Sequence, residues 1–177
     1  MRVLVTGSTG HLGEALMRLL PELGHEPLGL DLTPGPFTRF VGSITDRSLV
    51  RRSLSDADAV MHTATLHKPH VATHSKQAFI DTNISGTLVL LEEAVRPEVQ
   101  RFVFTSTTST FGSALNPSPG MPAAWIDETV TPAPKNIYGV TKVAAEDLSE
   151  LFAKRHGLGC IVLWTSRFFP EMDTTRR

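Results

Sequence analysis

The feature that most constrains the fold is a short apolar run that leads directly into three evenly spaced glycines. Val3–Val5 is followed by Gly7, Gly10 and Gly13 in a G-x-x-G-x-x-G arrangement, after which leucines recur at helical spacing. Glycines permit a tight turn and a close approach of the backbone to a ligand, and a helix N-terminus offers free N–H groups. This strand–turn–helix unit therefore predicts a phosphate-binding loop at the start of an α/β fold.

The rest of the chain alternates between strand and helix patterns. Further strands are expected at Glu26–Asp31, Thr38–Val41, Ala59–His62, Phe102–Thr105 and Ile161–Leu163. Helices are expected over the leucines from Leu12 to Leu23, over Arg47–Leu54 with Asp46 as N-cap, over Gln77–Val95 and over Asn136–His156. This alternation predicts a doubly wound parallel sheet, with apolar strands covered on both faces. The proline-rich segment Asn116–Pro134 is expected to be a long ordered loop where ligands bind.

Bulk composition excludes several classes of function. The 177 residues suit one domain, of which 41% are hydrophobic and 20% charged, and the formal net charge is −1. We therefore expect neither nucleic-acid binding nor membrane association, since no apolar run approaches the roughly 20 residues of a membrane span. The single cysteine, Cys160, is interpreted as a small core residue, in keeping with a reducing cytoplasm.

An acidic residue at the end of the second expected strand extends the phosphate-loop interpretation. Asp31 lies 18 residues after Gly13. A carboxylate there accepts hydrogen bonds from a ribose 2′-hydroxyl and repels a 2′-phosphate, which favours NAD over NADP. The alternative, a structural turn followed by an ordinary strand-end aspartate, stays open from the residues alone.

A second motif places a phenol and an ammonium one helical turn apart. Tyr138 and Lys142 share one helix face, and a nearby ammonium favours the phenolate, so we expect a lowered pKa and a usable base at Tyr138. The same lysine can hydrogen-bond a nicotinamide ribose. Standing alone, the spacing also fits a solvated lysine beside a partly packed tyrosine. The six hydroxyl residues Thr105–Thr110 follow a buried strand and are expected to point into the ligand crevice.

Several segments together resemble one protein family. They are TGSTGHLG at Thr6–Gly13, Asp31, VMHTA at Val60–Ala64, NISGTLVLLEEA at Asn83–Ala94, FVFTSTTSTFG at Phe102–Gly112, YGVTK at Tyr138–Lys142 and SRFFP at Ser166–Pro170. In this order the chain resembles the extended short-chain dehydrogenases/reductases of the NAD-dependent epimerase/dehydratase type, which include the UDP-galactose epimerases. The resemblance implies a Rossmann-like fold and NAD as cofactor.

The resemblance also implies roles for individual residues. Tyr138 matches the acid/base, Lys142 its electrostatic partner and Thr107 the catalytic Ser or Thr. The implied NAD-binding residues are Gly7, Thr9, Gly10, His11, Leu12, Gly13, Asp31, Ser43, Ile44, Thr63, Ala64, Thr65, Asn83, Thr105, Tyr138, Lys142 and Phe168. No metal is implied.

Departures from the family pattern narrow the expected chemistry. Ser43 replaces an aspartate that contacts adenine, so Ile44 is expected to take more of that contact. Pro170 stands where sugar-nucleotide epimerases often have an asparagine, which weakens the case for a UDP-sugar. Thr108 and Ser109 stand where sugar dehydratases have two carboxylates, and this disfavours dehydratase chemistry.

The family usually continues into a substrate lobe. We therefore expect residues 1–170 to form the NAD-binding domain and 171–177 a polar tail where that lobe would follow, with little or no lobe in this chain. Apolar residues of the long helices are assigned either to the core or to a homodimer interface, and the two tryptophans to core or loop anchors. Three histidines are interpreted as a polar loop at the substrate cleft rather than a metal site. These residues are Leu88, Leu91, Leu148 and Leu151; Trp125 and Trp164; and His67, His70 and His74.

The leading hypothesis is an NAD-dependent oxidoreductase or epimerase that acts on a secondary alcohol, such as that of a sugar or nucleotide sugar. Tyr138 would remove the hydroxyl proton while the nicotinamide takes the hydride from the same carbon. The alternatives are a non-catalytic NAD-binding module and, third, a purely structural α/β domain.

Overall fold

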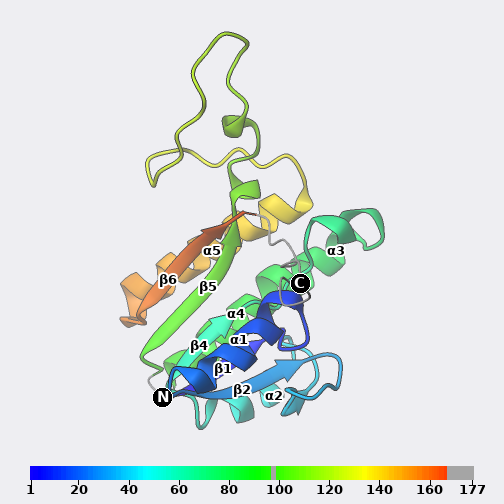
Figure 1. The fold of residues 1–177 in the computed structure, drawn as a ribbon, viewed down its shortest axis with the longest axis vertical. Coiled ribbons are helices and arrows are strands. Elements are labelled where there is room, and N and C mark those ends of the chain that lie inside the picture. Colours follow the sequence, from blue (N-terminus) through cyan, green and yellow to red (C-terminus); the bar gives the residue numbers. More distant parts are fainter. Residues whose placement is uncertain (97–98, 167–177) are drawn as a thin grey trace, which may run out of the picture.

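The computed structural model is described over residues 1–96 and 99–166, which form one parallel sheet with helices on both faces (Figure 1). The strands of this part are β1 (Arg2–Thr6), β2 (Glu26–Asp31), β3 (Phe40–Val41), β4 (Ala59–His62), β5 (Arg101–Thr107) and β6 (Cys160–Thr165). They pair in the order β3-β2-β1-β4-β5-β6, with every neighbouring pair parallel. The order reverses between β1 and β4, so the predicted doubly wound, Rossmann-like sheet is confirmed, and ligands are expected at the strand ends beside this point.

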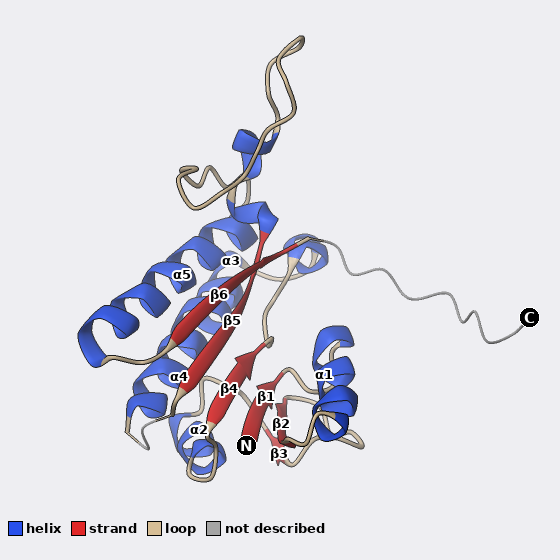
Figure 2. Cartoon of the chain, turned by 60° about the vertical axis from the view of Figure 1, so that its left-hand side comes forward, coloured by secondary structure: helices blue, strands red, loops and turns tan. Residues whose placement is uncertain are grey.

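Helices are divided unequally between the two faces. Helix α1 (His11–Glu22) covers one face, whereas α2 (Arg47–Leu54), α4 (Gly86–Val95) and α5 (Ile137–His156) cover the other (Figure 2). Short helices α3 (Lys76–Phe79), η1 (Lys68–Ala72), η3 (Thr108–Thr110) and η4 (Gly112–Leu115) lie in the connections. No helix of the described part is long and apolar enough to cross a membrane.

Local signals set the helix ends. The Asp46 side chain accepts hydrogen bonds from the N–H groups of Ser48 and Leu49, at 2.9 and 3.1 Å, and so caps α2. The Asn136 side chain caps α5 through the N–H of Gly139, at 3.0 Å. Helix α5 ends at Gly157, whose φ of 69° is the left-handed conformation that glycine adopts readily. The predicted bounds of α2 are therefore confirmed, whereas α5 begins one residue later than predicted, at Ile137, because Asn136 is its extended N-cap.

The apolar residues form two clusters, one on each face of the sheet. Alternate residues of β1 point to opposite faces, so Leu4 joins the larger cluster and Val3 and Val5 join the smaller one. The larger cluster lies under α2, α4 and α5 and includes the fully buried Phe102 and Phe104 of β5. These two phenylalanines place the end of β5 firmly against α5.

One prediction about the sheet is wrong. The strands were expected to be covered on both faces, but Ile161 and Leu163 of β6 are 47% and 45% exposed. Helix α1 packs on β1 and β2, and no described helix lies over this face of β6 (Figure 2). Exposed and half-buried residues therefore alternate along β6.

The predicted helix Gln77–Val95 is interrupted. Helix α3 begins one residue earlier, capped by Ser75, and is followed by a π-helical turn, η2 (Ile80–Ser85), before α4 begins at Gly86. π-helical turns often occur at functional sites. Here the turn contains Asn83, whose side chain bonds segments outside its own helix. The third strand is also shorter than expected, beginning at Phe40 instead of Thr38.

Helix leucines and tryptophans divide between interior and surface. Leu91 is fully buried, Leu88 and Leu148 pack against the core, and Leu151 is 48% exposed. The homodimer therefore stays a prediction. Trp164 is half-buried, but Trp125 is 86% exposed, so its assignment as an anchor is wrong. Cys160 is half-buried against the core, and burial raises the pKa of its thiol to about 11.

Trp125 lies in the proline-rich loop that projects beyond the strand ends (Figure 1). The loop is held at its base by hydrogen bonds between the backbones of Ser113 and Ala133 and of Ala133 and Thr110, each 3.0 Å long. The loop therefore extends from the sheet rather than folding back over it (Figure 1).

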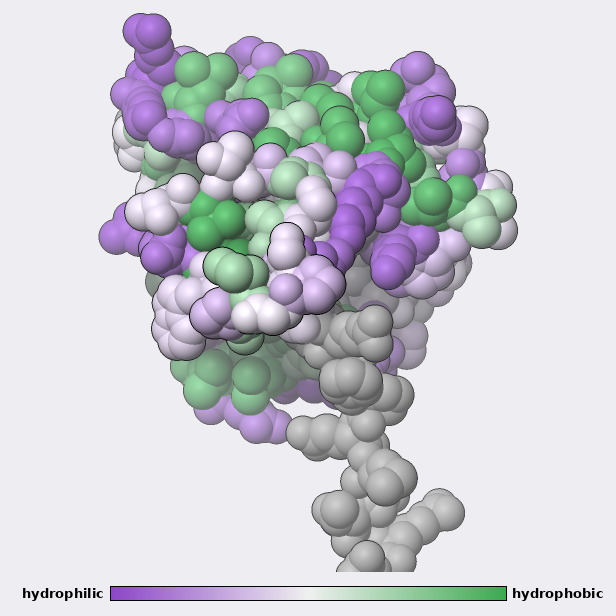
Figure 3. Space-filling view, turned by 90° about the horizontal axis from the view of Figure 1, so that it is seen from above, coloured by the Kyte–Doolittle hydropathy of each residue, from purple (hydrophilic) through white to green (hydrophobic). Residues whose placement is uncertain are grey.

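Seen from above, hydrophobic residues form a band along one side of this end of the molecule (Figure 3).

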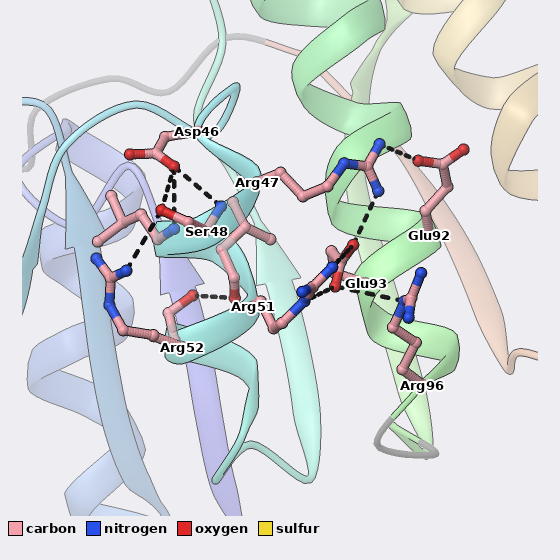
Figure 4. A network of polar contacts seen from close by, with 11 residues as sticks. Asp46, Arg47, Ser48, Arg51, Arg52, Glu92, Glu93 and Arg96 are labelled. Carbon is pink, nitrogen blue, oxygen red and sulfur yellow. Dashed lines mark hydrogen bonds and ion pairs between the residues drawn. The ribbon is translucent and has the colours of Figure 1, made fainter.

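Helices α2 and α4 are joined by a charge cluster around Glu93 (Figure 4). The Glu93 carboxylate is buried and forms ion pairs of 2.8 Å with Arg47, 2.8 Å with Arg51 and 3.5 Å with Arg96. Hydrogen bonding from Arg51 is the largest cause that lowers the pKa of Glu93, to about 2. The negative charge of Glu93 is therefore balanced by the three arginines that contact it.

Candidate active site

The glycine turn after β1 is shaped by backbone contacts that leave no room for side chains. Gly7 has a φ of 75°, and a Cβ placed on Gly13 would lie 1.9 Å from the Gly7 carbonyl oxygen. Gly10 is the N-cap of α1 and has no side chain to bond the first N–H groups of the helix. His11 lies exposed and Leu12 half-buried in this first turn. This is the geometry that a pyrophosphate needs for close approach to a helix N-terminus.

Asp31 connects the end of β2 to this turn. Its two carboxylate oxygens accept hydrogen bonds from the N–H groups of Thr9 and Thr33, each 3.0 Å long. A carboxylate oxygen has two acceptor positions, so both oxygens can accept a further hydrogen bond. Asp31 is therefore held beside the glycine turn and can still accept hydrogen bonds from the two hydroxyl groups of a ribose.

A buried hydrogen-bond chain links β1, β4 and α4 behind the turn. The Thr6 hydroxyl lies 2.7 Å from His62 Nδ1, and His62 Nε2 lies 2.9 Å from the Thr87 hydroxyl. Thr87 donates to the Asn83 carbonyl, so it accepts from His62, which must carry its proton on Nε2. Burial lowers the pKa of His62 to about 3, and the ring is neutral.

Asn83 is the junction between the loop after β4 and helix α5. Its Oδ1 accepts hydrogen bonds from the Thr65 hydroxyl and the Leu66 N–H, at 3.0 and 2.8 Å. Its Nδ2 donates to the Leu66 carbonyl and to the hydroxyl of Thr141, at 2.9 and 3.0 Å. All four hydrogen-bonding positions of this amide are occupied, which places the loop residues Thr63–Thr65 beside α5. The side chain of Thr63 itself bonds the Thr6 carbonyl.

The predicted phenol, ammonium and hydroxyl meet at the end of β5. Lys142 is 2% exposed, and its Nζ donates a 2.6 Å hydrogen bond to the Thr105 carbonyl while lying 3.9 Å from the centre of the Phe104 ring. Thr107 hydrogen-bonds the phenol of Tyr138, which is 8% exposed. The structure thus brings together the three residues to which the resemblance gives catalytic roles.

The pKa of Tyr138 shifts in the direction opposite to the one expected. Burial raises it above the ordinary value of 10.0, and the hydrogen bond with Thr107 lowers it by less. Burial also lowers the pKa of Lys142 to about 7, so the ammonium that was expected to favour the phenolate is itself destabilised. In the ligand-free chain Tyr138 is therefore a protonated phenol.

The expected adenine contact differs in detail from the sequence interpretation. Ile44 is buried, and its side chain lies against the Cα of Gly86, so only its backbone can face a ligand. The Ser43 hydroxyl bonds the hydroxyl and the N–H of Thr45, at 2.7 and 3.1 Å. Phe168 and Pro170 lie outside the described residues.

The three histidine rings pack edge-to-face around η1, from His67 before it to His74 after it. The rings of His67 and His70 are 4.5 Å apart, and those of His70 and His74 are 5.0 Å apart. Among the described residues, no group of three or more His, Cys, Asp or Glu side chains is arranged to hold a metal ion. His70 Nδ1 accepts a 3.0 Å hydrogen bond from the His67 N–H, which favours its neutral form.

Sequence analysis missed two titratable residues of this site, the buried His62 and the half-buried Glu146. Glu146 lies one helical turn beyond Lys142, so it continues the i, i+4 series that begins at Tyr138. That spacing is a signal from which it could have been found. His62 carries no such signal, because its partners Thr6 and Thr87 are 56 and 25 residues away.

Known proteins resemble this chain over most of its sequence. The model of the NAD dependent epimerase/dehydratase family matches residues 3–175. The chain is 32% identical over 182 residues to a dTDP-glucose 4,6-dehydratase of Streptomyces niveus, covering 92% of this chain and 52% of the relative. It is 29% identical over 171 residues to a UDP-glucose 4-epimerase of Streptomyces lividans, covering 90% and 50%.

A solved structure gives the same result for the fold. The UDP-glucose 4-epimerase of Thermus thermophilus, in complex with NAD, superposes with a TM-score of 0.80 at 28% identity, covering 93% of this chain and 54% of that one. The chain thus spans about half the length of these proteins.

Proposed function

The chain belongs to the NAD dependent epimerase/dehydratase family, and from this membership we propose that it binds NAD and transfers hydride at a secondary alcohol of a sugar or nucleotide sugar. The observation that carries the proposal is the convergence of three features at one end of the sheet. They are the glycine turn with Asp31, the loop held by Asn83, and the Thr107–Tyr138–Lys142 group.

The residues present fit this dinucleotide. The turn at Gly7, Gly10 and Gly13 would receive the pyrophosphate at the N-terminus of α1. Asp31 would accept hydrogen bonds from the adenine-side ribose and would repel a 2′-phosphate, so NAD is favoured over NADP. Lys142 would hold the nicotinamide-side ribose next to Thr105.

The chain's own residues would handle the substrate proton. Thr107 would hydrogen-bond the alcohol oxygen, and Tyr138 as phenolate would accept its proton. Lys142 in its protonated form would stabilise that phenolate. When bound, NAD supplies the acceptor for the hydride that leaves the same carbon, so the alcohol is oxidised to a ketone as NAD is reduced.

The identity of the following residues bears on the reaction type. Thr108 and Ser109 form a 3₁₀ turn directly after Thr107 and carry hydroxyl groups. Water elimination from a keto sugar needs an acid and a base, and hydroxyls with ordinary pKa values serve poorly as either. These residues therefore favour an epimerase or a dehydrogenase over a dehydratase.

The relatives named above act on dTDP-glucose or UDP-glucose, and this chain aligns with about half of each. One alternative is a module that binds NAD without turnover. Assay of UDP-glucose and UDP-galactose interconversion separates the two, because Tyr138→Phe abolishes interconversion in an enzyme, whereas a binding module shows none to lose.

Isothermal calorimetry tests the proposal at its first step. The chain should bind one NAD⁺, and more tightly than NADP⁺, and Asp31→Asn should reduce that preference. Gly13→Ala should abolish binding, because the added Cβ would collide with the Gly7 carbonyl. Ala15→Ser, at an exposed position of the same helix, serves as the control. No binding of either dinucleotide to the folded chain would refute the proposal.

A further inference from the structure

Glu146 lies in the layer between α5 and the ends of β5 and β6. One of its carboxylate oxygens accepts a hydrogen bond from the Ser106 hydroxyl, and the other accepts one of 3.2 Å from Trp164 Nε1. Indole N–H is only a donor, so the ionised carboxylate satisfies both contacts. The residue therefore connects the helix of Tyr138 and Lys142 to two neighbouring strands.

The Lys142 ammonium lacks a direct counter-ion in the described part of the chain. It contacts the Thr105 carbonyl and the face of the Phe104 ring, both of which are uncharged. Burial favours loss of its proton, and the charge of Glu146 opposes that loss. The neutral His62 lies on its β4 side and Tyr138 lies on its own helix.

We infer that Glu146 is a positioning residue for the Tyr138–Lys142 pair, an inference that rests on the proposed function. Its carboxylate keeps the Lys142 ammonium charged in an apolar setting, and its hydrogen bond with Ser106 fixes the end of β5. Ser106 stands between Thr105, whose carbonyl receives the ammonium, and Thr107, whose hydroxyl meets the phenol. One side chain thus sets both the charge and the geometry of the site.

The charge of Lys142 matters because only an ammonium stabilises a phenolate. With a neutral amine beside it, burial would still raise the pKa of the Tyr138 phenol, and no positive charge on Lys142 would lower it. With the pKa of Lys142 lowered to about 7, a modest loss of negative potential is enough to discharge it at neutral pH. Glu146 is the carboxylate that supplies this potential, through space rather than by an ion pair.

The test is a lysine titration by NMR of the chain labelled with ¹³C at lysine Cε. The sequence has five lysines, and Lys142→Arg identifies the signal of Lys142. In Glu146→Gln, which retains hydrogen-bonding capacity but removes the charge, the pKa of Lys142 should fall by roughly one pH unit, as expected for a charge at this range. In the matched control Asp147→Asn, which removes the same charge from the next, exposed residue, it should stay unchanged.

An unmoved Lys142 titration in Glu146→Gln, or an equal shift in Asp147→Asn, would overturn the inference. Should Glu146→Gln fail to fold by circular dichroism, Glu146→Asp decides, since it keeps the charge and shortens the reach to Ser106 and Trp164. A wild-type titration in that variant supports a charge effect, and a fallen pKa contradicts it. The titration needs no NAD, so calorimetry with NAD⁺ on the same samples tests the proposed function separately.

Discussion

Two carboxylates of the described residues, Glu93 and Glu146, lie on helices that cover the sheet, and their surroundings shift their pKa values in opposite directions. Glu93, between α2 and α4, is surrounded by three guanidinium groups, and its pKa is lowered to about 2 (Figure 4). Glu146, between α5 and the strand ends, has hydroxyl and indole donors instead, and burial raises its pKa. The first charge is compensated locally, whereas the second acts on Lys142.

The difference shows that, of the described charges in these two regions, those without a direct ion-pair partner lie on α5, at Lys142 and Glu146, rather than between α2 and α4. A buried ion with full partners contributes mainly to structure, because its field is cancelled nearby. A carboxylate and a buried ammonium can lie near each other without forming an ion pair, and each then shifts the pKa of the other. Catalytic groups acquire useful pKa values in this way. We therefore expect the charge cluster around Glu93 to affect stability. The N-terminal half of α5, which carries Tyr138, Lys142 and Glu146, is expected to affect catalysis.

The largest expected effect separates chemistry from stability at the site itself. Tyr138→Phe should reduce turnover at least about a hundredfold, because it removes the group that accepts the substrate proton. NAD⁺ affinity and the unfolding midpoint should change little, since the ring remains. Steady-state assay with UDP-glucose, with calorimetry alongside, measures both. Turnover at the wild-type rate would show that another group carries the proton.

Next in size is the pH dependence of stability at Lys142. Its folded pKa of about 7 lies below the ordinary 10.5, so the stability penalty of the buried charge is full below pH 7 and disappears as pH rises toward 10.5. When the pH is lowered from 9.5 to 7, the wild type should lose stability that Lys142→Met does not lose. The free energy of unfolding of Lys142→Met, relative to that of the wild type, should therefore rise by up to about 3 kcal/mol. Urea unfolding at both pH values measures this. A pH-independent difference would mean that the ammonium is not buried.

Glu93→Gln should produce a smaller loss, and in stability alone. We expect about 1–2 kcal/mol at pH 7, limited because solvent screens the half-exposed arginines. The folded pKa lies below the ordinary 4.5, so this contribution is present above pH 4.5 and is lost as pH falls toward 2. Urea unfolding gives the values, with Glu92→Gln as the more exposed control. A change in NAD⁺ affinity would erase the distinction between the two regions.

The smallest effect concerns the outermost arginine of the cluster. Arg96 is 65% exposed at its side chain and lies 3.5 Å from Glu93, so Arg96→Ala should cost no more than about 0.5 kcal/mol. The same unfolding assay, compared at low and high salt, provides the check. A larger loss would show that the three guanidinium groups act as one unit.

Local signals were enough to predict most of the fold. The strands Glu26–Asp31 and Ala59–His62 and the helix Arg47–Leu54 have the predicted bounds, because apolar runs and the Asp46 cap act within a few residues. The π-helical turn could not be predicted in this way. Its Asn83 bonds Leu66 and Thr141, which are 17 and 58 residues away.

The site was predictable in its members but not in its electrostatics. The i, i+4 spacing brought Tyr138 and Lys142 onto one face, and the structure places Thr107 beside the phenol. The direction of the Tyr138 pKa depends on burial, and burial depends on the packing of β5 against α5. Spacing along one helix contains no information on that packing.

The central claim is that NAD lies at the strand ends with its nicotinamide beside the phenol of Tyr138. Because the chain has one tyrosine, ultraviolet difference absorbance of phenolate reports Tyr138 alone. We predict that saturating NAD⁺ lowers the pKa of Tyr138, since the cationic nicotinamide and Lys142 then both favour the phenolate. Tight binding of NAD⁺ with an unchanged phenol titration would contradict the account.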